Sequence, residues 1–391
     1  MQFKCILIIA CCLLAGIAYA APPPLDCARK SLADSINSNP EKSITFTGIC
    51  SGPIVIRTDG LTLTGVGTAI IDGGGQNAVT LNGIHGVSLV NLEIRNGKNG
   101  ILGVNGTHMS LKNVNVHDNQ GFGISFQTAS SGILSNVTTN HNGIHGLDLE
   151  TGSACTITGP FTSSDNRVFG INANGSSLTF SLATATVSGN ALGIQVATGA
   201  NTFINDPKTV LNLTDNFATG LTVVSGGHMV SFGGTIIATG NSVNGVSLNS
   251  KAGLDLDAGS ILTCDNNGDG LLLQENSVMT VFNIPQFSGA SGFSMVSCSH
   301  NRGNGIKLRS GSTLTLSNQA KLNSTQNGAI GLVADDGVGT TLVNSVITGN
   351  AIEDIQLTFG SRADLQTLTF DSYTCDTTVL VRGTKGIICP H

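Results

Sequence analysis

Four ionisable side chains each stand directly before an asparagine in successive copies of a repeated motif: Arg95, Asp118, His141 and Asp165. If the copies stack, equivalent residues lie about 4.8 Å apart, and these side chains form one exposed column. An imidazole between carboxylates can act as a general acid or bind a metal ion. The column is therefore a candidate catalytic site, although Asp and His that merely solvate a turn would give the same pattern.

A second set of polar residues follows the asparagines at strand-like spacing. Asp148, Asn172 and Gln195 alternate with aliphatic residues, and His145 precedes the first of them. Rows of amides and hydroxyls can hydrogen-bond an extended glycan, which makes these four residues candidate ligand-binding positions. Aromatic platforms for sugar rings are scarce, because the chain has no Trp and only Phe122 and Phe169 lie nearby.

The repeat that carries these residues has a period in the mid-twenties, which marks a repeat architecture. Its asparagines stand at 96, 119, 142, 166, 190, 216, 241, 266, 301, 327 and 350. Apolar residues alternate with polar ones on both sides of each Asn, so each period contains at least two short strands with one buried face. No amphipathic helix recurs. The pattern predicts an all-β, single-stranded, right-handed parallel β-helix of about 12–13 coils.

Stacked asparagines can satisfy one another, because an amide both donates and accepts hydrogen bonds. We therefore predict a structural ladder of Asn119, Asn142, Asn166, Asn190, Asn216, Asn241 and Asn266, continued by the later repeats. A glycine four residues after most of these asparagines gives the backbone freedom to enter the next strand.

The chain ends suggest export and capping. Residues 1–20 have the charged, apolar and A-x-A regions of a signal peptide. We expect an N-terminal cap over 21–50, the β-helix over 51–358 and a C-terminal cap over 359–391. Disulfides Cys27–Cys50 and Cys375–Cys389 would tie the caps, whereas Cys155, Cys264 and Cys298 are expected as buried small side chains. A loop around 283–291 should interrupt the longest repeat interval.

The composition of the chain limits the classes of partner that it can bind. A net charge of −6 without basic runs argues against nucleic acid, and no apolar run after the signal peptide could span a membrane. The sequence suggests no cofactor. Asp265–Gly270 matches half of a calcium loop, but its twelfth position is Asn276 and the coil motif already explains it, so Ca²⁺ is unsupported.

Residues 43–75, "SITFTGICSGPIVIRTDGLTLTGVGTAIIDGGG", and 79–101 resemble the opening of right-handed β-helix repeat proteins of the pectin-lyase-like superfamily. The coil motif extends this resemblance to about residue 358. It implies the fold but does not select a chemistry, since members include lyases, polygalacturonases, epimerases and non-catalytic surface proteins. The polygalacturonase motifs are missing from this chain.

Two functions therefore stay open. The first is a secreted, periplasmic or cell-surface protein, non-catalytic, that binds polysaccharide or another surface partner. The second is a polysaccharide lyase, hydrolase or epimerase that uses residues 95–172. The absence of catalytic signatures favours the first.

Overall fold

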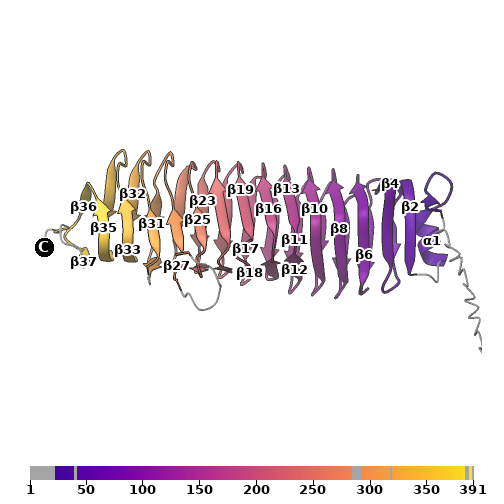
Figure 1. Ribbon diagram of the computed structural model, residues 1–391, viewed down its shortest axis with the longest axis horizontal. Coiled ribbons are helices and arrows are strands. Elements are labelled where there is room, and N and C mark those ends of the chain that lie inside the picture. The colour runs from indigo at the N-terminus through magenta and orange to yellow at the C-terminus, as the bar shows by residue number, and fades with distance from the viewer. Residues whose placement is uncertain (1–22, 39–41, 284–291, 318, 384–386, 390–391) are drawn as a thin grey trace, which may run out of the picture.

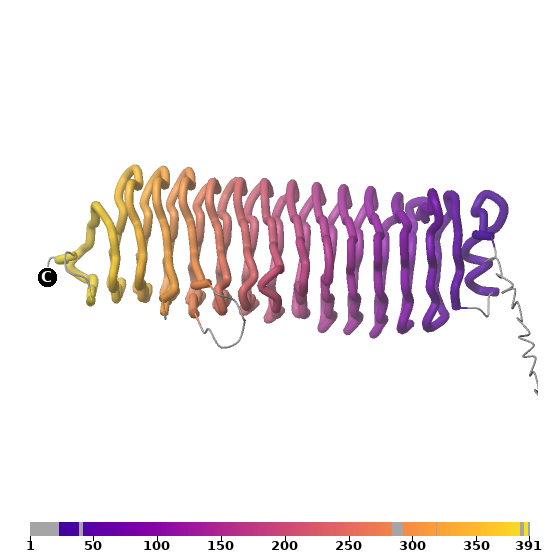
Figure 2. Tube along the Cα trace, viewed as in Figure 1, coloured from indigo at the N-terminus to yellow at the C-terminus, as the bar shows by residue number. Residues whose placement is uncertain are grey.

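The chain folds into a straight rod of stacked coils, seen along its length in Figures 1 and 2. This computed structural model describes residues 23–38, 42–283, 292–317, 319–383 and 387–389. All strand pairs are parallel and form two long sheets. The rod has about 14 turns, because the smaller sheet contributes one strand per turn and has 14 strands. The predicted fold is confirmed, with slightly more turns than expected.

The 14-stranded sheet, called sheet B here, consists of β3 (Ile54–Ile56), β5 (Val79–Asn82), β7 (Ile101–Val104), β9 (Ile124–Phe126), β11 (His145–Glu150), β14 (Phe169–Asn174), β17 (Leu192–Ala197), β20 (Thr219–Val224), β23 (Asn244–Asn249), β26 (Asp269–Leu273), β29 (Ile306–Leu308), β32 (Ile330–Ala334), β34 (Glu353–Leu357) and β36 (Tyr373–Cys375).

The other sheet, sheet A, consists of β1 (Leu25–Asp26), β2 (Ser43–Ser51), β4 (Thr62–Asp72), β6 (Val87–Arg95), β8 (His108–His117), β10 (Ser131–Asn140), β12 (Ala154–Ile157), β13 (Pro160–Ser164), β15 (Ser177–Phe180), β16 (Thr184–Ser188), β18 (Asn201–Ile204), β19 (Val210–Thr214), β21 (His228–Phe232), β22 (Thr235–Thr239), β24 (Gly253–Asp257), β25 (Ile261–Thr263), β27 (Val278–Val281), β28 (Met295–Ser297), β30 (Thr313–Leu316), β31 (Lys321–Asn323), β33 (Gly339–Ile347), β35 (Arg362–Phe370) and β37 (Leu380–Arg382).

Each coil crosses sheet A in two segments, which meet at a bend. In β8 the bend is Asn113, whose φ of 54° is left-handed. Asn91 and Asn136 occupy the same place in the neighbouring coils with φ of 56° and 53°. Their side chains are linked, since Asn113 donates to Asn91 (2.7 Å) and Asn136 donates to Asn113 (2.9 Å). Asn tolerates this conformation, so its recurrence fixes the corner.

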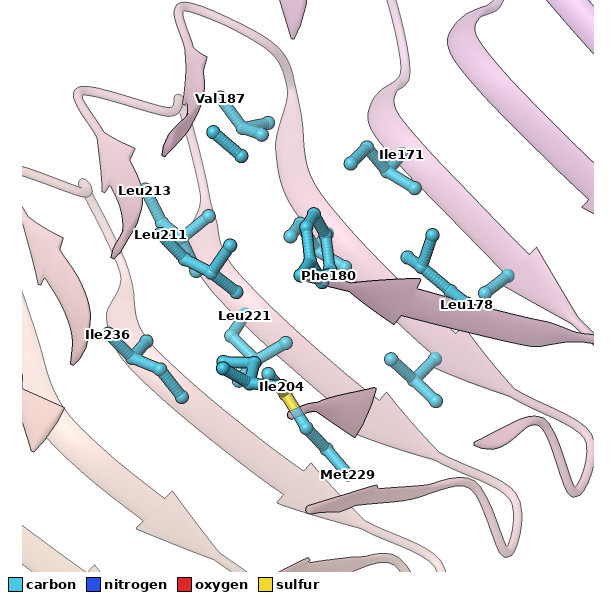
Figure 3. Close-up of a cluster of buried hydrophobic side chains, with 14 of the residues drawn as sticks. Ile171, Leu178, Phe180, Val187, Ile204, Leu211, Leu213, Leu221, Met229 and Ile236 are labelled. Carbon is cyan, nitrogen blue, oxygen red and sulfur yellow. The ribbon is translucent and has the colours of Figure 1, made fainter. Parts of the chain in front are cut away.

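The core runs through the middle of the rod. Inward residues of both sheets pack in layers, as Figure 3 shows for Leu178, Phe180 and Ile204 of sheet A and Ile171 and Leu221 of sheet B, all fully buried. Burying a side chain of this size stabilises the fold by roughly 1.5–3 kcal/mol. Because strands alternate, every second residue is left to face outward and is free to serve function.

An asparagine ladder joins sheet A to sheet B inside the rod. The Asn190 amide donates to Asn216 Oδ1 (3.2 Å) and accepts from the amide and the backbone N–H of Asn166 (3.0 and 2.9 Å). The ladder runs through Asn119, Asn142, Asn166, Asn190, Asn216, Asn241, Asn267, Asn301, Asn327 and Asn350.

One predicted ladder position is wrong, and one further motif asparagine lies outside the ladder. Asn267, rather than Asn266, accepts from Asn241 (3.0 Å), while Asn266 takes the preceding left-handed position with φ of 58°. Asn96 likewise has φ of 55°, and Gly97 occupies the ladder position, donating its N–H to Asn119 Oδ1 (2.9 Å). At Asn266 the motif was ambiguous, because the next residue is also an asparagine.

The N-terminal end is covered by α1 (Leu32–Ser38), whose buried Leu32 and Ile36 face the first coil. Disulfides Cys27–Cys50 and Cys375–Cys389 are present as predicted. Parallel pairing already begins with β1 and β2 and continues beyond residue 358 through β35 to β37. The predicted signal peptide (1–20) and most of the predicted loop (283–291) lie outside the described residues.

A third disulfide, Cys264–Cys298, corrects the expectation that both residues are buried thiols. Thr263 pairs with Ser297, so Cys264 and Cys298 are equivalent residues of neighbouring coils, and their Cα atoms lie 4.5 Å apart. The long interval between these coils hid this equivalence. Cys155 is free and buried, as expected, and burial raises the pKa of its thiol above its usual range.

Candidate functional site

Asp118, His141 and Asp165 do form one column, called the ridge here. All three are left-handed, with φ of 53°, 52° and 55°, because each is the residue at which the coil turns into the ladder asparagine. Together with Gln120 and Arg167 they line a shallow surface depression of about 430 Å³. The structure thus brings together three of the four candidate catalytic side chains, and it adds a guanidinium.

Arg95 does not belong to the ridge, contrary to the prediction. It is paired in register with His117, one position before Asp118. The reason is the shift at Gly97, which moves Asn96 into the left-handed position that Asp118 fills in the next coil. The Asn96 side chain donates to Asp72 Oδ2 (2.7 Å).

Arg95 instead takes part in a charged network on the outer face of sheet A. Its Nη1 contacts Glu93 Oε1 at 3.0 Å, and its Nε lies 3.6 Å from Asp72 Oδ2. His117 contacts Glu93 Oε1 through Nε2 (3.1 Å) and Asp118 Oδ2 through Nδ1 (2.7 Å). The network therefore ends on the ridge. Glu93 was not recognised from the sequence, although its alternation with buried neighbours in β6 marks it as outward-facing.

Beyond the ridge, the outer face of sheet B carries an aromatic row of Phe122, His145 and Phe169. The His145 ring centroid lies 5.4 Å from that of Phe122 and 4.7 Å from that of Phe169. Both Phe side chains face outward and are half-buried. Burial lowers the pKa of His145 to about 4, against a hydrogen bond with the Ile144 backbone that raises it. His145 is thus neutral at pH 7, and its Nδ1 accepts the Phe169 N–H (3.2 Å).

The polar row lies next to the aromatic row and consists of Ser125, Asp148, Asn172 and Gln195. Its members are joined by hydrogen bonds: Ser125 donates to Asp148 (2.9 Å), Asn172 donates to Asp148 (2.9 Å), and Gln195 donates to Asn172 (3.2 Å). These residues face outward as predicted, but Asp148 is fully buried and Asn172 is only 5% exposed. They form a strip that is largely closed to solvent.

Burial raises the pKa of Asp148 to about 6. The Asn172 hydrogen bond lowers it, the charge of Glu150 raises it further, and the Ser125 hydrogen bond lowers it. No cation pairs with Asp148 in the contacts of the described residues, so its carboxylate rests on neutral donors. Its charge is mostly present at pH 7 and costs free energy to hold there.

The described residues contain no group of three or more His, Cys, Asp and Glu side chains that could hold a metal ion. The half calcium loop at Asp265–Gly270 is an ordinary coil, in which Asp265 Oδ1 accepts the Ser299 N–H (2.6 Å). Within the same residues, no helix has the length and apolar character needed to cross a membrane.

Residues 53–207 match the family model described as "Right handed beta helix region". This match agrees with the parallel β-helix fold of the structure and with the resemblance noted in the sequence. A search of curated protein sequences returned no match.

Solved structures similar to the chain include an alginate epimerase and a mannuronan C-5 epimerase module. The periplasmic alginate epimerase AlgG is 12% identical with a TM-score of 0.50, over 87% of this chain and 83% of AlgG. The A-module of Azotobacter vinelandii mannuronan C-5 epimerase AlgE6 is 14% identical with a TM-score of 0.41, over 90% of this chain and 94% of the module. At this identity the likeness establishes the fold alone.

Proposed function

We propose that this chain is an exported, non-catalytic polysaccharide-binding β-helix protein whose glycan lies across the ridge and the outer face of sheet B. The observation that carries this proposal is that three surface features lie on the same coils. The ridge depression, the aromatic row and the polar row all fall on the coils that contain residues 118–126, 141–150 and 165–174.

Each component suits a sugar chain. Half-buried Phe rings offer flat apolar surfaces, which pack against the C–H faces of sugar rings. Carboxylates, amides and the Arg167 guanidinium next to them can hydrogen-bond hydroxyl groups. The flat, open surface of a solenoid allows an extended polymer to pass across several coils.

The charged side chains that line the depression favour binding of a neutral or sparsely charged glycan. In the depression, the carboxylates of Asp118 and Asp165 face the single guanidinium of Arg167. A densely anionic polymer would meet repulsion there, since like charges brought together cost free energy. Disulfides support the export that the proposal requires, because they persist in oxidising compartments.

The test is binding to soluble xyloglucan, galactomannan, alginate and polygalacturonate by affinity electrophoresis. Arg167→Ala and Phe169→Ala should each weaken retardation by the bound polymer about tenfold or more, as loss of an interface anchor does. Phe217→Ala is the matched control, because Phe217 occupies the position of Arg167 two coils later and is 71% exposed. Equal losses in all three variants, or no retardation by any polymer, would refute the proposal.

A second candidate is a polysaccharide-acting enzyme. The contacts of His117 with Glu93 and Asp118 favour it, because a histidine oriented by carboxylates can transfer protons. One of the structural neighbours named above is an alginate epimerase, which makes alginate the first substrate to try. Unsaturated products would appear by ultraviolet absorbance and epimerised residues by NMR. Turnover that is lost in His117→Gln would replace the binding proposal with this one.

A further inference from the structure

A second groove, which His117 links to the ridge, lies on the outer face of sheet A in the coils of β4, β6, β8 and β10. Its volume is about 430 Å³. The corner asparagines Asn91, Asn113 and Asn136 form one side, and Glu93, Asn115 and Thr138 line the other. This groove is not part of the proposed glycan surface, which faces outward from sheet B.

An insertion in β4 walls one end of the groove. Thr64 pairs with Val90 and Ile70 pairs with Glu93, so five residues (65–69) stand opposite two (91–92). The insertion packs closely against β6. A Cβ at Gly65 would lie 2.1 Å from the Asn91 carbonyl oxygen, so only glycine fits at this position. Thr47 also donates to the Thr68 carbonyl oxygen (3.2 Å). The wall is therefore a fixed part of the fold.

The groove is rich in acceptors and lacks cations. Glu93 is the only ionisable side chain among its lining residues. Its Oε1 is engaged by Arg95 and His117, which orient the carboxylate. The Asn115 Oδ1 atom, in the same file of side chains as Glu93, is buried and receives no hydrogen bond from the described protein. A buried acceptor without a donor costs roughly 1–3 kcal/mol, so this atom favours a ligand that donates.

We infer that this groove is a binding site for an uncharged sugar unit, separate from the ridge surface. The Glu93 carboxylate accepts from sugar hydroxyls, and the half-buried Asn115 side chain turns to bring its Oδ1 to another hydroxyl. The corner asparagines add amide donors and acceptors, and Ile70 and Leu92 supply a small apolar floor. Glu93 excludes uronate and other anionic sugars from the groove. The inference does not depend on the proposed function of the ridge.

The experiment is isothermal titration calorimetry of the mature chain, made in a bacterial host, with cellotetraose, mannotetraose, maltotetraose and trigalacturonate. At least one neutral tetrasaccharide should bind, and Asn115→Leu should weaken that binding at least tenfold. Thr138→Val should weaken it several-fold and gives a second, conservative probe. Trigalacturonate should not bind the groove.

Asn212→Leu is the matched control. Asn212 has the same outward position as Asn115 four coils later, is also half-buried, and lies outside the groove. The Asn212→Leu variant should bind the neutral tetrasaccharide as the wild type does. Phe169→Ala should also leave the tetrasaccharide affinity unchanged, which separates this site from the ridge surface. Absence of binding by every neutral tetrasaccharide, or equal affinity in Asn115→Leu and Asn212→Leu, overturns the inference, whatever happens to polymer binding.

Discussion

Two stretches of the rod share one backbone and differ in what they present to solvent. The site coils (residues 118–174) and the plain coils (residues 190–273) have the same ladder, the same left-handed turn and the same pairing. Yet the ridge positions, which hold Asp118, His141 and Asp165 in the site coils, hold Gly189, Asp215 and Gly240 in the coils that follow. The aromatic row of Phe122, His145 and Phe169 continues as Leu192, Thr219 and Asn244.

The difference separates what the fold requires from what it leaves free. Inward residues and the ladder recur because each coil must bury an apolar layer and satisfy its turn. Outward residues have no such duty, so Arg167 can correspond to the exposed Phe217 without cost to the coil. Function should therefore be sought where the outward residues depart from the pattern, and changes there should spare stability.

The largest expected effect concerns the covalent link in the plain coils. Replacing Cys264 and Cys298 with alanine should lower the unfolding free energy by about 3–4 kcal/mol, because the disulfide closes a loop with a sequence separation of 34. Cys155→Ala, which removes a buried thiol without a bridge, should cost only about 1 kcal/mol. Urea unfolding measures both. Alkylation of the denatured, unreduced chain that lacks residues 1–20 should label one thiol, and three labelled thiols would exclude the bridge.

Next in size is the ladder. Asn267→Ala should lower the unfolding free energy by about 3 kcal/mol, because the Asn241 amide and the backbone N–H of Asn241 both lose their acceptor. Asn266→Gly is a neighbouring control that should leave stability nearly unchanged, since glycine accepts the left-handed φ of 58°. Thermal melts of the two variants show which asparagine stands in the ladder. A lower melting temperature for Asn266→Gly than for Asn267→Ala would assign Asn266 to the ladder.

A smaller, pH-dependent effect is expected at Asp148 in the site coils. The folded pKa of about 6 lies above the ordinary value of 3.8, so the folded state binds a proton more tightly than the unfolded one. This contribution to stability is fully present below pH 3.8 and is lost as the pH rises through 6. Asp148→Asn should thus stabilise the protein by about 1–3 kcal/mol at pH 7 and by almost nothing at pH 3.5, in urea unfolding.

His145 provides the opposite pH dependence. Its folded pKa of about 4 lies below the ordinary value of 6.5. Burial of the neutral imidazole therefore stabilises the fold above pH 6.5, and this contribution is lost as the pH falls through 4. The two groups oppose each other in the wild type between pH 4 and 6. In Asp148→Asn only the histidine remains, and stability should rise with pH over that window. A flat profile in the variant would contradict the burial of His145.

The smallest stability effect is expected on the ridge itself. Asp165→Asn and Asp215→Asn should each change the unfolding free energy by less than about 0.5 kcal/mol, because Asn adopts the left-handed turn as readily as Asp at exposed positions. The two residues are matched, since each carboxylate lies over a glycine of the next coil, Gly189 or Gly240. Only Asp165→Asn should weaken glycan binding, and equal binding by both variants would remove the ridge from the site.

Much of the fold could be predicted because the repeat encodes it. The period, the alternation and the recurring Asn each report a local requirement that every coil must meet. Errors arose where two adjacent residues met the requirement equally, as at Asn266 and Asn267, or where an insertion separated equivalent residues, as at Cys264 and Cys298.

The candidate site could be predicted only in part. Sequence spacing placed Asp118, His141 and Asp165 together, because they share one turn position. It could not show that outward-facing Asp148 is buried, since that depends on how neighbouring side chains close over the strip. The sheet A groove was also invisible, because it is created by the insertion at 65–69 and by long-range register.

The amide ladder has a direction. Every asparagine in it donates toward the next coil, and the last, Asn350, donates to Asp354 Oδ1 (2.8 Å). The other carboxylate oxygen accepts from the backbone N–H groups of Asp371 and Ser372 (2.7 and 3.1 Å). An ionised carboxylate accepts hydrogen bonds but cannot donate one, so the series of side-chain hydrogen bonds ends at Asp354. One side chain, standing where earlier coils carry glycine, thus ends the asparagine ladder, while parallel strand pairing continues beyond it through β36 and β37.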